Sequence, residues 1–88
     1  MAGKFLLKIV SPQGVQVNEE VESVTAPGAL GEFGVLVGHT PFLTTLRAGV
    51  VSYTVGAEKK SIRVPGGIAE VRAREAILLI TQSVKMVF

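Results

Sequence analysis

Side chains that could do chemistry gather in one stretch of the 88-residue chain, GALGEFGVLVGHTPF at positions 28–42. This stretch holds four glycines, Glu32 and the only histidine, His39. A Ser-His-Glu hydrolytic arrangement is conceivable, with Glu32 orienting His39. No serine stands in a G-x-S-x-G context, however, and the chain contains no aspartate. We therefore predict no catalytic residues and expect a protein that is not an enzyme.

The glycines of this stretch do not predict a nucleotide or metal site. Their spacing matches neither G-x-G-x-x-G nor G-x-x-x-x-G-K-[ST], and no lysine or expected helix follows them. One histidine without cysteine or aspartate cannot supply the usual three protein ligands of a metal. We therefore expect no cofactor and no metal. His39 is expected to bond loop carbonyls or amides, in a loop shaped for recognition.

Composition and charge narrow the classes of partner. Residues 1–88 are expected to form one domain, because so short a chain cannot build two cores. The basic residues are scattered, the net charge is only +2 and few aromatics are available for stacking, so we expect no nucleic acid partner. No run approaches the roughly 20 apolar residues that span a bilayer, so we expect no direct bilayer insertion. An apolar share of 48% suggests that a partner covers part of the surface.

Alternation of apolar and polar residues is the dominant pattern and predicts half-buried strands. It runs through residues 5–10, 15–21, 51–55, 62–64 and 84–88. A phase slip between Val21 and Val24 is interpreted as a β-bulge in one long strand. The apolar run AILLI at 76–80 fits a central strand, and turn residues recur at short intervals. The pattern predicts an all-β fold, either an antiparallel β-sandwich or a small barrel.

A longer match carries a resemblance to a known family. GALGEFGVLVGHTPFLTTLRAGVV followed by VPGGIAEV resembles the N-terminal domain of the epsilon subunit of bacterial F-type ATP synthases, and FLLKIVSPQGVQVNEEVESVTAPG fits the first two strands of that domain. The chain departs from the family at Val37, where proline usually precedes Gly-His, and at Pro65, where a small hydroxyl residue usually precedes the double glycine. The resemblance implies a roughly ten-stranded antiparallel β-sandwich or flattened barrel.

The resemblance also implies a function that works by contact. Members of the family are non-catalytic rotor subunits of the central stalk, which couple proton translocation to ATP synthesis. The implied partners are the gamma subunit and the c-ring loops within the whole F1Fo complex. The implied location is peripheral, on the cytoplasmic face of the bacterial inner membrane. The alternative is a free-standing β-barrel module that binds a small ligand.

Carried over position by position, the resemblance assigns three groups of residues. The expected c-ring contacts are Gly31, Glu32 and Phe33. The expected gamma-subunit contacts are Ser11, His39 and Pro41. The expected structural loop residues are Gly28, Gly34, Gly38, Gly66 and Gly67. Two of these residues also have plainer interpretations, Glu32 as an ordinary exposed loop carboxylate and Ser11 as a turn hydroxyl.

Members of the family commonly continue into a C-terminal pair of helices, which we expect this 88-residue chain to lack. A helix rises about 1.5 Å per residue, so a lever of tens of ångströms needs on the order of 20 further residues. Added to an epsilon-depleted ATP synthase, the 88-residue chain should restore coupling without ATP-dependent inhibition by its own tail. ATPase assays with and without prior incubation with ATP measure this, and latent inhibition that ATP relieves would contradict it.

Overall fold

The computed structural model describes residues 3–81, which form strands and their connecting turns. The nine strands of this part are β1 (Phe5–Ser11), β2 (Gly14–Val21), β3 (Ser23–Gly28), β4 (Gly31–Leu36), β5 (Phe42–Leu46), β6 (Gly49–Val55), β7 (Glu58–Val64), β8 (Gly67–Val71) and β9 (Glu75–Ile80). They form one sheet in the order β2-β1-β9-β8-β5-β3-β6-β7, with β4 paired to β3. The predicted all-β class is confirmed, while the strand expected at 84–88 lies outside the described residues.

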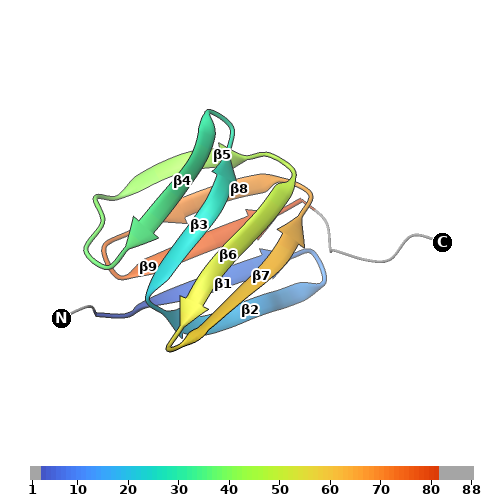
Figure 1. Cartoon of the computed structure of the whole chain (residues 1–88). Helices are drawn as coiled ribbons and strands as arrows, with labels where there is room; N and C mark the ends of the chain where they lie inside the picture. The colour runs from blue at the N-terminus through green and yellow to red at the C-terminus, as the bar shows by residue number, and fades with distance from the viewer. Residues whose placement is uncertain (1–2, 82–88) are drawn as a thin grey trace.

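The sheet curls into two layers. Figure 1 shows β4, β3, β6 and β7 in front, and β5, β8, β9, β1 and β2 crossing behind them. The chain alternates between these layers, so residues distant in sequence face one another across the core. Side chains that alternate inward along each strand fill the space between the layers.

One pairing departs from the antiparallel expectation. β1 and β9 run parallel, with Leu7 opposite Ala76 and Ile9 opposite Leu78. The other seven pairings among residues 3–81 are antiparallel. Parallel neighbours need a long connection rather than a hairpin, and here seven strands intervene between the two. The sheet is therefore mixed, and alternation alone could not have predicted this because it does not report strand direction.

The phase slip near Val21 is not a bulge in one long strand, contrary to our interpretation. β2 ends at Val21 on β1, and β3 begins at Ser23 beside β4 and β6. Between them the backbone N–H of Glu22 donates to the Thr54 carbonyl oxygen at 2.9 Å, so the chain has already joined the other layer. Val21 and Val24 are both buried. The slip therefore marks a change of layer that keeps both side chains in the core.

The alternation correctly predicts which side chains are buried. On β1, Phe5, Leu7 and Ile9 point inward and are buried. The run AILLI forms most of β9, which lies between β1 and β8 as a central strand. Its inward side chains are buried, but Leu79 on the outer face is 52% exposed. Residues 3–81 therefore leave one side of this apolar strand uncovered.

A row of residues crosses the corner where the sheet turns from one layer to the other. Gly28 on β3 pairs with Leu46 on β5, which pairs with Gly67 on β8, which in turn pairs with Ile80 on β9. Gly67 has φ +152°, and a Cβ there would overlap the Leu79 carbonyl oxygen. A Cβ on Gly28 would meet the Gly31 carbonyl oxygen at 2.7 Å. Close backbone approach at the corner therefore requires glycine on both sides of the buried Leu46.

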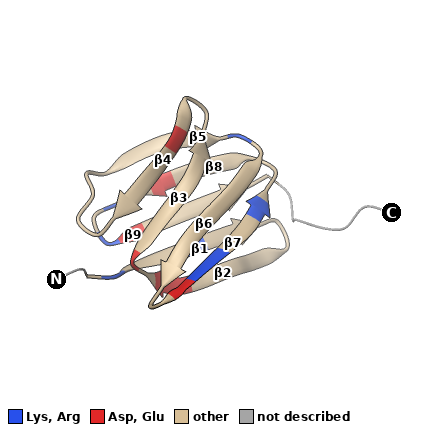
Figure 2. Cartoon of the chain, in the orientation of Figure 1, with Lys and Arg blue, Asp and Glu red and all other residues tan. Residues whose placement is uncertain are grey.

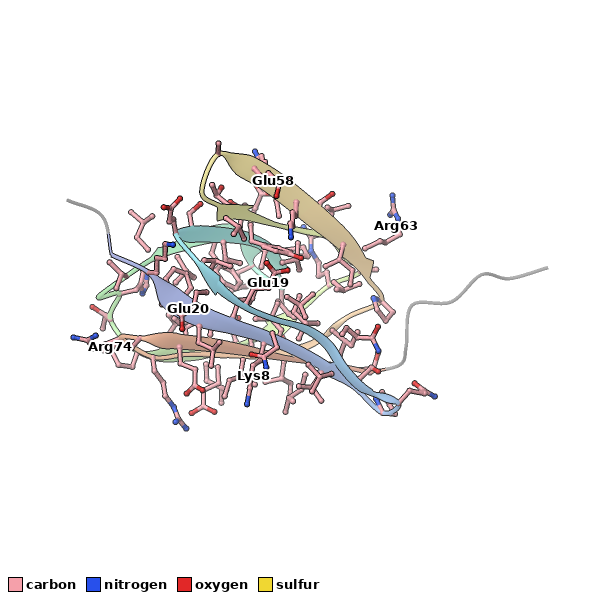
Figure 3. The ribbon with its side chains drawn as sticks, turned by 90° about the horizontal axis from the view of Figure 1, so that it is seen from below. Lys8, Glu19, Glu20, Glu58, Arg63 and Arg74 are labelled. Carbon is pink, nitrogen blue, oxygen red and sulfur yellow. The ribbon has the colours of Figure 1, made fainter. Side chains whose placement is uncertain are left out.

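An ion pair bridges the two layers at the opposite edge, where β2 and β7 end the sheet. The Lys60 ammonium lies 3.3 Å from Oε1 and 3.4 Å from Oε2 of Glu19. Figure 3 shows Glu19 between the layers, whereas Arg63 points away from the molecule. The hydrogen bond and charge of Glu19 raise the pKa of Lys60. Burial and the Glu19 charge raise the pKa of the neighbouring Tyr53.

Replacing Gly67 by alanine should destabilise the domain by about 3 kcal/mol or more, because strained backbone adds to the overlap with the Leu79 carbonyl. Gly34→Ala is the matched control. Gly34 needs no positive φ, and a Cβ there would meet only the Val24 carbonyl oxygen at an ordinary 3.8 Å. Urea unfolding of both variants measures the difference, and equal midpoints would contradict the role given to Gly67.

The ion pair at the β2–β7 edge predicts an alkaline loss of stability. The raised pKa values of Tyr53 and Lys60 mean that the folded state holds these protons more tightly than the unfolded chain does. The associated stability is fully present below about pH 10 and is lost as the pH rises through the folded values. Glu19→Gln removes a charge that raises both pKa values, so its unfolding midpoint should fall less steeply from pH 9 to about 11.5.

The matched control for this experiment is Glu20→Gln, on the exposed neighbour that makes no ion pair within residues 3–81. Its pH dependence should follow the unmodified chain. Denaturant titrations at each pH give the comparison. Identical alkaline slopes for the two variants would show that Glu19 does not couple the layers.

Candidate interaction surface at the β3–β4 tip

The turn that joins β3 to β4, residues 28–31, is called here the β3–β4 tip. Gly28 and Gly31 pair across its base, and Ala29 and Leu30 form the loop. Gly31 has φ +137°, a conformation that side chains disfavour. The Ala29 backbone N–H donates to the Thr45 carbonyl oxygen on β5 at 2.9 Å. Gly31 therefore permits the turn, and the bond from Ala29 restrains the tip against β5.

Glu32 is the first outward side chain after the tip. It is exposed, and it takes part in no ion pair among the residues that the structure describes. Figure 2 shows the single acidic position of β4 near the tip end of the strand, with basic positions on other strands. An exposed carboxylate on a rigid hairpin can pair with a cation of another molecule at little entropic cost.

Phe33, the next residue, turns inward and starts an aromatic cluster. Its ring meets that of Phe42 edge to face, with centroids 5.2 Å apart. Phe42 in turn lies 5.1 Å from the His39 ring. These partly buried rings fill the gap between the free edge of β4 and the start of β5. Of the expected c-ring contacts, Phe33 is thus linked through Phe42 to the expected gamma contact His39.

His39 belongs to a loop that the backbone pins in place. The His39 ring Nδ1 lies 2.7 Å from the Thr40 carbonyl oxygen, as expected for a histidine that bonds its own loop. The Gly38 backbone N–H, at φ +80°, donates to the Ala73 carbonyl oxygen at 2.8 Å. Pro41 is exposed beside it. This loop therefore presents a fixed surface next to the β8–β9 turn.

Ser11 lies apart from the other expected contact residues. It is only 5% exposed, and its hydroxyl accepts hydrogen bonds from the Gln16 side chain at 2.9 Å and the Gln13 backbone at 3.2 Å. The backbone N–H groups of Leu6, at the start of β1, and of Gly38 both donate to carbonyl oxygens of the β8–β9 turn. Ser11 lies five residues further along β1, roughly 16 Å from that turn. The structure therefore does not bring Ser11 and His39 together.

An exposed apolar surface escaped the sequence analysis. Leu43, Ile68 and Leu79 are 70%, 45% and 52% exposed on the outer face of β5, β8 and β9. Ile68 and Leu79 are direct neighbours across the β8–β9 pair. One sequence signal could have indicated this surface, because AILLI has bulky apolar side chains at both its inward and its outward positions. The composition predicted covered apolar area, but only the pairing of strands locates it.

Residues 3–81 hold no cluster of three or more potential metal ligands, and no helix there has the length and hydropathy needed to cross a bilayer. Fold and surface together define a β-sandwich domain with a hairpin tip and an exposed apolar surface. The chain belongs to the family described as "ATP synthase, Delta/Epsilon chain, beta-sandwich domain", whose model matches residues 4–86.

Curated relatives carry the same designation. The chain is 46% identical over 80 residues to the ATP synthase epsilon chain of Desulfatibacillum aliphaticivorans, covering 90% of this chain and 57% of that protein. It is 40% identical over 79 residues to the ATP synthase epsilon chain of Desulfitobacterium hafniense strain DCB-2, covering 90% of this chain and 60% of that protein. The chain thus spans somewhat more than half the length of these relatives.

Solved structures share the fold. A chain of the Euglena gracilis mitochondrial ATP synthase, in a structure of OSCP, F1 and c-ring, matches with a TM-score of 0.86 at 23% identity, over 96% of this chain and 54% of that chain. A chain in the Tetrahymena thermophila mitochondrial ATP synthase central stalk and c-ring matches with a TM-score of 0.74 at 15% identity, over 92% of this chain and 66% of that chain. These matches establish the β-sandwich fold.

Proposed function

We propose that this domain is a non-catalytic rotor part of an F-type ATP synthase, which binds the gamma subunit and the c-ring loops and so couples proton translocation to ATP synthesis. The observation that carries the proposal is the family match over residues 4–86, which includes all nine described strands. In this role the domain lies at the periphery of the membrane, on its cytoplasmic face, as part of the F1 sector.

The geometry supports a role in contact rather than chemistry. A rotor part has to transmit force without deforming, and a sheet curled over one continuous apolar core is stiff because interiors are close-packed. The tip offers a carboxylate to a basic loop, as the family resemblance implies for the c-ring. The loop of His39 and Pro41, with the outer apolar face, offers area to a larger partner such as gamma.

Recovery from membranes tests the proposal against a free-standing ligand-binding module. The tagged full chain, incubated with epsilon-depleted membranes, should recover gamma and c subunits of the ATP synthase. A small molecule that copurifies in stoichiometric amount, with no ATP synthase subunit recovered, would favour the ligand-binding alternative instead.

Reversing the charge of Glu32 should weaken attachment to the c-ring at least tenfold, because Glu32→Lys places like charges together where the proposal places a basic loop. The free energy of unfolding should change within about 0.5 kcal/mol, since Glu32 is an exposed residue without an ion pair in the described part of the chain. Glu58→Lys, on exposed β7, is the matched control and should bind normally. Equal binding by both variants would argue against the role of Glu32.

A further inference from the structure

Leu30 is an apolar side chain in the loop of the β3–β4 tip, and it is fully exposed. Single exposed leucines are common on protein surfaces and need no explanation by themselves. Leu30 differs because it stands next to a groove and two residues from the exposed carboxylate of Glu32. Its position therefore makes Leu30 a candidate contact residue in an assembly.

The loop that carries Leu30 is held before any partner arrives. Besides the Ala29 bond to Thr45, the Arg47 backbone N–H donates to the Pro27 carbonyl oxygen at 2.9 Å, so the β3 side of the hairpin is tied to the end of β5 on both sides of Gly28. The ring of Phe33 packs within 3.2 Å of where a Gly28 Cβ would stand, so the ring is in close contact with the backbone at the base of the tip. A preformed contact loses little conformational freedom on binding, so each buried atom contributes more to affinity.

The groove beside Leu30, called here the tip groove, runs between the tip and β5. It has a volume of about 340 Å³, and Leu30, Glu32, Phe33, Phe42 and Leu43 line it. The edge-to-face pair of Phe33 and Phe42 lies between its banks. Leu43, 70% exposed, lines the same groove as Leu30. The side chains that line the tip groove are thus apolar apart from Thr44 and Glu32, and the Glu32 carboxylate has no ion pair within residues 3–81.

We infer that the tip groove takes one aliphatic side chain of a partner loop whose adjacent residue is a lysine or arginine, with Leu30 as the apolar anchor and Glu32 as the charge partner. The volume lies at the low end for binding sites, which admits a side chain or two but no helix or strand. The four apolar side chains of the lining favour an aliphatic group, and the carboxylate favours a neighbouring cation. The inference rests on the proposed function, in which this loop belongs to the c-ring.

The test is Leu30→Ser in the full chain, measured with two probes from the Desulfatibacillum aliphaticivorans enzyme. One probe is the detergent-solubilised c-ring, and the other is epsilon-depleted F1, which carries gamma without the c-ring. Leu30→Ser should lose at least tenfold in affinity for the c-ring at both about 0.01 M and about 0.15 M salt, because apolar contact is not screened. Glu32→Gln should lose affinity chiefly at the lower salt. Both variants should bind F1 normally.

Val15→Ser is the matched control, an aliphatic side chain 58% exposed on β2 and outside the tip groove. It should bind both probes like the unmodified chain, and thermal unfolding should be unchanged in Leu30→Ser because Leu30 is not part of the core. If Leu30→Ser binds the c-ring with normal affinity while Glu32→Gln binds it more weakly, the anchoring role of Leu30 is wrong and the proposed function still stands. A Leu30→Ser loss that disappears at higher salt would also overturn that anchoring role. An unmodified chain that binds neither probe would refute the proposed function itself.

Discussion

The fold depends on close backbone approach along the row of residues that crosses the corner between its layers. The row from Gly28 through Leu46 and Gly67 to Ile80 is where the front and rear layers join in one sheet. A Cβ on Gly67 would overlap the neighbouring β9 backbone, so the corner excludes every other residue type without rearrangement. Gly28 is also at the base of the β3–β4 tip, so its pairing with Leu46 fixes the direction in which the tip projects. The proposed contact site is thus an extension of the corner, which links its position to the stability of the whole sheet.

At the opposite edge, where β2 and β7 end the sheet, an ion pair takes the place of backbone pairing. A curled sheet that does not close leaves its two end strands, β2 and β7, facing each other across an opening to water. Glu19 occupies an inward position of β2, where an apolar residue would be expected, and Lys60 occupies the corresponding position on β7. Each long side chain lays its aliphatic part toward the core and keeps its charge at the rim. The pair covers the opening while avoiding an apolar edge that would attract other strands.

The two exposed features of the domain differ in chemistry and so suit different contacts. The outer face of β5, β8 and β9 exposes the aliphatic side chains of Leu43, Ile68 and Leu79, whereas the tip is narrow and combines aliphatic and acidic groups. Broad apolar area provides affinity, while a small charged tip provides orientation and selectivity. Leu43 lies on β5 where the two features meet. A rigid body with both features is suited to bind two different partners at the same time.

By itself, the sequence determined which side chains face inward, where turns fall, and that His39 bonds its own loop, because these properties depend on neighbours a few residues away. Phe5, Leu7 and Ile9 are buried as the alternation predicts. Tertiary structure alone decided the parallel pairing of β1 with β9, the change of layer at Glu22 and the pairing of Glu19 with Lys60. Alternation reports the face of a strand but neither its partner nor its direction, so contacts across tens of residues leave no local signal. For the same reason the sequence did not show that Leu43 on β5 lines the same groove as Leu30 on the β3–β4 tip, since only the assembled sheet brings the two elements together.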